Sequence, residues 1–186
     1  MPNLLEHWLV VIEWVDWTMK SITARALSEL YSWVYYKTAA LLSAKEKEVL
    51  NSPDTSTQKR FDRYLEVVRS DIASIQEIQP SWQVIFADRL IDTTICHHIS
   101  MDERVLLRDA PALSQSIKRI QILLTASTDR ILRNISWKDV RSRFDLDEGL
   151  IVATQRKLEQ CHNDLVVDVS HGDPKKVLRR ILEHFS

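Results

Sequence analysis

The fold prediction depends on residues 4–43, which read LLEHWLVVIEWVDWTMKSITARALSELYSWVYYKTAALLS. Apolar side chains recur along this stretch in steps of three and four residues, which is the spacing of one face of an α-helix. The members of this seam are Leu5, Trp8, Ile12, Val15, Met19, Ile22 and Ala26. Val10 and Val11 lie off the seam, so the predicted helix is apolar over more than half of its surface. Such a helix must be covered on most sides, by the rest of this chain or by another chain.

The composition favours helices over sheets. The chain has 186 residues, of which 45% are hydrophobic and 27% are charged, as is typical of a soluble globular domain. It has only 2 glycines, whereas β-hairpins depend on turn residues such as glycine. We therefore predict an all-α protein, with a multi-helix bundle over residues 1–134. A winged-helix-like segment with one short β-strand is expected over residues 136–186.

Several elements have clear patterns of their own. The spacing of apolar residues predicts an amphipathic helix over 58–79 and a second one from Pro111 to Asn134. The β-branched run at 165–169 is the one convincing strand, and Pro174 begins a last helix that extends to Phe185.

The segment 137–160 has the outline of a helix-turn-helix, with a short helix at 137–144, a tight turn and a second helix at 149–161. The second helix would expose Gln155 and Arg156, residue types that read base edges in the DNA major groove. Acidic neighbours of the turn, such as Asp145 and Asp147, would repel phosphates. An ordinary helical hairpin, or a winged domain used for protein contact, is the alternative.

The charges are distributed unevenly along the chain. Residues 1–103 carry 10 basic and 15 acidic side chains, and residues 104–186 carry 15 and 11. The predicted last helix bears four basic residues that would form a phosphate-binding stripe: Lys175, Lys176, Arg179 and Arg180. The alternative is that they are the solvated face of an amphipathic helix.

The sequence shows no convincing catalytic motif. Arg156…His162 and Arg179…His184 have the spacing of the Arg–His pair in HEPN-class ribonucleases, but about one or two such pairs are expected by chance. Cys96-His97-His98 and Cys161-His162 contain ligand types, yet adjacent helical residues point about 100° apart. With no glycine-rich phosphate loop, no Gly-x-Ser-x-Gly and no His-Glu-x-x-His, we predict no metal, no cofactor and no catalysis.

The tryptophans of the first stretch suggest a protein interface, because Trp is enriched at binding hot spots. The candidates are Trp8, Trp14, Trp17 and Trp33. Burial in the core of the bundle is the alternative.

The leading functional prediction is a non-catalytic accessory subunit of a larger assembly. It would bind a protein partner or a second copy through the tryptophan helix, and nucleic acid through its basic end. The alternatives are a dimeric helix-turn-helix DNA-binding regulator and a small HEPN-like, metal-independent RNase that uses Arg179 and His184. We expect no membrane span and no signal peptide, because Glu13 and Asp16 interrupt the apolar run and no basic segment precedes it. A cytoplasmic location is expected, since 2 cysteines make no disulfide framework.

Overall fold

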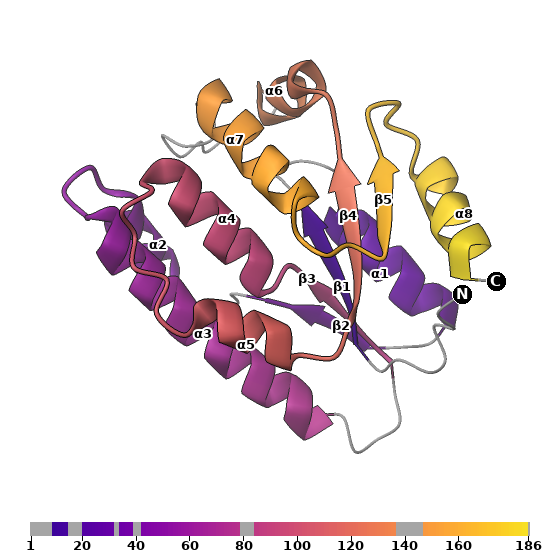
Figure 1. Ribbon diagram of the computed structural model, residues 1–186. Helices are drawn as coiled ribbons and strands as arrows, with labels where there is room; N and C mark the ends of the chain where they lie inside the picture. Colours follow the sequence, from indigo (N-terminus) through magenta and orange to yellow (C-terminus); the bar gives the residue numbers. More distant parts are fainter. Residues whose placement is uncertain are drawn as a thin grey trace.

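The computed structural model describes residues 9–14, 20–31, 34–38, 42–78, 84–136 and 147–185. These residues form a five-stranded sheet with the strand order β2-β3-β1-β4-β5, and every pair of neighbouring strands is parallel (Figure 1). The central strand β1 (Leu9–Trp14) lies between β3 (Ile85–Asp88) and β4 (Ile120–Thr125). The edge strands are β2 (Val34–Lys37) and β5 (Leu165–Asp168).

Helices cover both faces of the sheet. On one face, α1 (Lys20–Tyr31) and α8 (Pro174–Phe185) pack side chains such as Leu27 and Val177 into one core with Val10 and Ile12 of β1. On the other face, α3 (Thr57–Ile78), α4 (Ile91–Met101) and α5 (Ala110–Ser116) share a core with Leu9 and Val11. The remaining described helices are α2 (Ala44–Asn51), α6 (Thr128–Ser136) and α7 (Glu148–Glu159), and α7 packs against α4, β1 and β4.

The all-α prediction is therefore wrong, and β1 shows why. Leu9, Val10, Val11 and Ile12 are all 0–1% exposed, because helices bury both faces of this central strand. A strand buried on both faces is a continuous apolar run without polar alternation, and such a run can also match a helical seam. The predicted helical seam is wrong at Ile12, which belongs to β1, whereas its members Leu5 and Trp8 lie outside the described residues.

The inference that a low glycine content excludes a sheet was also wrong. Parallel strands are joined by helical crossovers rather than by hairpins, so this sheet does not depend on glycine-rich turns. The predicted helix from Pro111 to Asn134 is instead three elements, namely α5, the buried strand β4 and α6.

Other elements agree with the sequence patterns. The amphipathic helix at 58–79 is α3, and the strand predicted at 165–169 is β5. Pro174 occupies the first position of α8, and the side chain of Asp147 caps α7 by accepting a hydrogen bond from the Leu150 backbone N–H at 2.9 Å. The predicted helix at 137–144 lies outside the described residues. The predicted second helix of the helix-turn-helix is α7, which packs on the sheet.

Among the described helices, none combines the length and apolar character that a membrane crossing requires.

Candidate active site

The carboxyl ends of the central strands bring polar side chains together. Ile12 of β1 is in register with Asp88 at the end of β3, and Glu13 follows Ile12. Asp88 is 5% exposed and accepts a hydrogen bond at 3.1 Å from the Tyr35 hydroxyl of the edge strand β2. Open α/β sheets bind their ligands at the carboxyl ends of the strands. This edge is therefore the candidate site, and α1 begins beside it because it follows β1 directly in the chain.

Arg89 adopts an unusual backbone conformation at this edge. Its φ angle is 70°, and its N–H donates to the Ile12 carbonyl oxygen of β1 at 3.1 Å. A positive φ at a residue other than glycine costs free energy and is concentrated at functional positions. The Arg89 side chain is half-buried, and its charge adds to burial and to the neighbouring His98 in lowering the pKa of His97. The end of β3 therefore carries an acidic residue, Asp88, next to a basic residue, Arg89.

Glu13 is a fully buried carboxyl group behind this edge. One of its oxygens accepts from the Leu90 backbone N–H at 3.1 Å, and the other accepts from the backbone N–H and the hydroxyl of Thr93. Burial and the neighbouring Asp92 raise its pKa to about 7, although the Thr93 hydrogen bond and Arg119 act in the opposite direction. A carboxyl group that titrates near neutral pH beside a ligand-binding edge can exchange a proton under working conditions.

This shift makes the stability depend on pH. Between the ordinary pKa of 4.5 and about 7, folded Glu13 binds more protons than the unfolded chain does. We expect the free energy of unfolding to fall by roughly 2–3 kcal/mol as the pH rises through this window. Glu13→Gln should flatten that part of the profile, as measured by urea unfolding at a series of pH values. An unchanged slope in the variant would assign the dependence to other groups.

A neutral aromatic cluster lies between α3 and α4. The His98 ring lies 5.5 Å, between centroids, from each of the rings of Phe61, Tyr64 and His97. Burial lowers the pKa of His97 to about 3 and that of His98 to about 4, so both are neutral at pH 7. The Nδ1 atom of His98 lies 2.7 Å from the Thr94 carbonyl oxygen and acts as the donor there. Its buried Nε2 has no hydrogen-bond partner within the described part of the chain. The cluster therefore combines aromatic faces with uncharged hydrogen-bonding groups.

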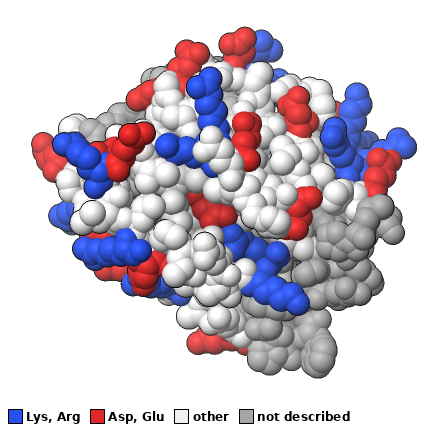
Figure 2. Space-filling model, in the orientation of Figure 1, with Lys and Arg blue, Asp and Glu red and all other residues white. Residues whose placement is uncertain are grey.

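The residues predicted as nucleic-acid contacts are not brought together. Gln155 and Arg156 belong to α7, whereas the four basic residues belong to α8 on the opposite face of the sheet. The Gln155 side-chain oxygen accepts from the Ala126 backbone N–H at 3.4 Å, and Arg156 is exposed. On α8, Arg179 pairs with Glu183 at 2.7 Å, and the other three basic residues, Lys175, Lys176 and Arg180, are also exposed. Figure 2 shows basic and acidic side chains interspersed over one face of the described surface.

The tryptophan predictions cannot be placed. Trp8, Trp17 and Trp33 lie outside the described residues, and of Trp14 only the backbone, in β1, is described. The cysteine–histidine groups also differ from a metal site, because no three metal-binding side chains gather among the residues that the structure describes.

The sequence reasoning missed one pattern. Phosphate loops with the sequence Gly-x-x-x-x-Gly-Lys-Ser/Thr connect a strand to a helix, and Lys20-Ser21 opens α1 after β1. Lys20 and Ser21 occupy the last two positions of this pattern, whereas Trp14 and Met19 stand at its glycine positions. A search that requires both glycines passes over this partial match. A buried β-branched run followed by a Lys-Ser pair is the signal that could have found it.

Several solved structures have a similar fold. Thymidylate kinase from Candida albicans has a TM-score of 0.70 and 16% sequence identity, covering 95% of this chain and 90% of that chain. Thymidylate kinase from Ehrlichia chaffeensis has a TM-score of 0.68 and 14% identity over 100% of both chains. Deoxyadenosine kinase from M. mycoides with bound dATP has a TM-score of 0.68 and 13% identity, covering 94% of this chain and 97% of that chain. No family model matches the sequence, and no curated protein matches it.

These likenesses show an α/β nucleotide-kinase-like fold and overturn the predictions that rested on an all-α chain. The accessory subunit, the helix-turn-helix regulator and the HEPN-like RNase are all contradicted. The prediction that the protein is not an enzyme is corrected on the same ground, because the likeness points to nucleotide kinases.

Proposed function

We propose that this protein is a nucleotide kinase, which transfers a phosphoryl group from a nucleoside triphosphate to a nucleoside or nucleoside monophosphate. One observation carries the proposal: Lys20-Ser21 opens α1 directly after the central strand β1, at the edge where Glu13, Asp88 and Arg89 also lie. Phosphoryl transfer needs phosphate positioning and charge stabilisation more than covalent chemistry, and this edge has the groups for both.

Each group has a role that fits its chemistry. The N-terminus of α1 and the Lys20 ammonium would bind the phosphates of the donor. Ser21 and Asp88 offer hydroxyl and carboxylate oxygens, which are the ligands that Mg²⁺ prefers, so the donor set fits this ion. Bound Mg²⁺ would neutralise the charge that develops on the phosphates. Arg89 supplies a further positive charge at the end of β3.

The neutral cluster on α3 and α4 supports a heterocyclic acceptor. His97 belongs to α4, the helix whose first turn binds Glu13 through Thr93, so the cluster and the strand edge share one helix. Phe61 and His98 are 0% and 2% exposed, so the half-buried rings of Tyr64 and His97 are the members that could face a nucleobase. The similar structures include kinases of thymidylate and deoxyadenosine. We therefore place the acceptor among nucleosides and nucleoside monophosphates.

The test is a phosphoryl-transfer assay with ATP and GTP as donors and a panel of ribo- and deoxynucleosides and their monophosphates as acceptors. Chromatography of the products should show one acceptor class converted in a Mg²⁺-dependent reaction. Asp88→Asn should reduce this conversion, whereas Asp102→Asn, at the C-terminal end of α4, should leave it unchanged. The proposal fails if no acceptor is converted and calorimetry detects no binding of ATP or GTP at millimolar concentration.

Trp14 and Met19, which stand at the two glycine positions of the phosphate-loop pattern, lead to a separate prediction. Glycine at these positions lets the backbone approach the phosphates closely and adopt any φ angle. We expect the double variant Trp14→Gly/Met19→Gly to bind ATP about 10- to 150-fold more tightly, which is the usual contribution of one hydrogen bond to a charged group. Isothermal titration calorimetry would measure the change, with Trp82→Gly as a control for the loss of a tryptophan elsewhere. Equal affinities for the wild type and the double variant would show that the loop does not contact phosphate.

A further inference from the structure

Two cysteines that are distant in the sequence meet between α4 and the end of α7. The Cys96 and Cys161 sulfur atoms are 3.6 Å apart across a separation of 65 residues. A disulfide has an S–S distance of about 2.05 Å, so the two sulfurs need to approach by only about 1.5 Å. Since α4 and α7 pack against each other, small side-chain movements can supply this approach.

The two thiols differ in exposure. Cys96 is 3% exposed, whereas Cys161 is half-buried. Both line a cavity of about 390 Å³, together with Asp92, Arg119 and His162. A small reagent can therefore reach the half-buried Cys161 through this cavity, whereas Cys96, which lines the same cavity, is only 3% exposed.

The hydrogen bond between the thiols distinguishes them further. It lowers the pKa of Cys161 and raises that of Cys96, which burial raises as well. The thiolate is the reactive form of cysteine. The accessible sulfur is thus also the one that ionises more readily.

We propose that Cys96 and Cys161 are a redox-modification site that a peroxide converts reversibly to an intramolecular disulfide. The Cys161 thiolate attacks one peroxide oxygen, the O–O bond breaks, and the other oxygen leaves as hydroxide, which takes up a proton to become water. The resulting sulfenic acid is attacked by the Cys96 sulfur, which loses its proton, and the hydroxyl group leaves as a second water. Two thiols are oxidised and one peroxide is reduced.

The disulfide would fasten α4 to the end of α7. The first turn of α4 holds Glu13 through Thr93, and the same helix carries His97 and His98. Oxidation therefore fixes the helix that borders the candidate site. The proposed disulfide does not rest on the proposed function, because its formation is detected by thiol counts and mass rather than by an activity assay.

The experiment treats the folded, reduced protein with hydrogen peroxide. Titratable thiols, counted in denaturant, should fall from 2 to none, with the loss of two hydrogen atoms in the intact mass. A non-reduced digest should contain the peptide pair joined through Cys96 and Cys161, dithiothreitol should restore both thiols, and the oxidised protein should melt several degrees higher. Failure to form this pair, or its formation only between two molecules, overturns the proposal.

Two variants test the order of the steps. In Cys96→Ser, peroxide should leave Cys161 as a sulfenic acid that dimedone traps. In Cys161→Ser, the buried Cys96 should react at least about tenfold more slowly. Equal rates in the two variants would contradict the roles assigned to the accessible and the buried thiol.

Discussion

Replacing Arg119 with methionine should lower the free energy of unfolding by about 3–5 kcal/mol. The Arg119 guanidinium lies 2.7 Å from the Asp92 carboxylate, and the two side chains are only 10% and 9% exposed. It also donates to the Ser114 carbonyl oxygen at 2.6 Å and to the Gln121 side-chain oxygen at 2.8 Å. Methionine keeps the volume of the aliphatic stem but leaves Asp92 charged and buried without its cation. Urea unfolding at pH 8 measures the loss.

A surface pair provides the matched control. Arg104 and Asp102 also form an ion pair, at 2.9 Å, but the Arg104 side chain is 90% exposed. Arg104→Met should cost no more than about 1 kcal/mol, because water solvates both charges when the pair is broken. Adding Asp92→Asn to Arg119→Met should recover part of the loss, since the buried charge is then removed. Similar losses for Arg119→Met and Arg104→Met would show that the Asp92–Arg119 pair is not desolvated in solution.

The buried pair also influences the candidate site. Asp92 raises the pKa of Glu13, and Arg119 lowers it. Loss of Arg119 therefore removes a nearby positive charge, and the pKa of Glu13 should rise further. The pair thus couples the packing of α4 against the segment that precedes β4 to the protonation of a carboxyl group behind the strand edge.

The sequence correctly predicts elements whose apolar residues follow the repeat of only one type of secondary structure. The helix α3 is amphipathic along its length, and α8 begins at a proline, so both were predicted within one or two residues. The strands β1 and β4 were missed, because burial on both faces removes the alternation that identifies a strand. The periodicity of Leu9–Trp14 alone is compatible with a helix as well as with a strand.

The candidate site was missed for a related reason. Its members come from the ends of different strands, and only the strand order places Glu13 beside Asp88. Cys96 and Cys161 were recognised separately, but no property of the sequence indicates that their sulfur atoms meet. The sequence contains the Lys20-Ser21 pair, but the pair matches a phosphate-binding pattern only when β1 is known to be the strand that precedes it.

Lys20→Met should reduce phosphoryl transfer by about 100- to 1,000-fold, which is the usual effect of removing one preorganised group that stabilises transition-state charge. Lys20 is the first residue of α1, where the free backbone N–H groups and the helix dipole already favour phosphate. Methionine keeps the unbranched side chain and removes only the ammonium charge. The rate is measured with saturating donor and acceptor, so that a change in kcat is separated from weaker binding.

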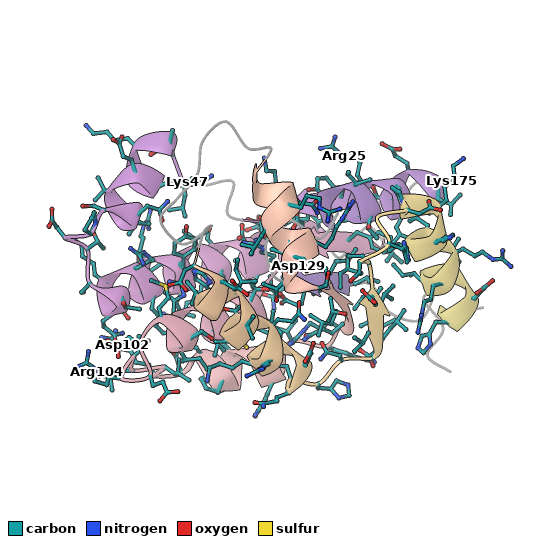
Figure 3. All side chains as sticks on the ribbon, turned by 90° about the horizontal axis from the view of Figure 1, so that it is seen from above. Arg25, Lys47, Asp102, Arg104, Asp129 and Lys175 are labelled. Carbon is teal, nitrogen blue, oxygen red and sulfur yellow. The ribbon has the colours of Figure 1, made fainter. Side chains whose placement is uncertain are left out.

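Lys175→Met is the control, because Lys175 also lies in the first turn of a helix, and it is exposed. Figure 3 places it at one end of the molecule, opposite Arg104, and it belongs to α8 beside the edge strand β5. Its loss should leave kcat within about twofold of the wild type, since surface substitutions away from the site have small effects. Urea unfolding should show equal stability for both variants. If Lys20→Met keeps the full rate while phosphoryl transfer is observed, the phosphates are bound elsewhere, because the charge at the start of α1 is then not used in the transition state.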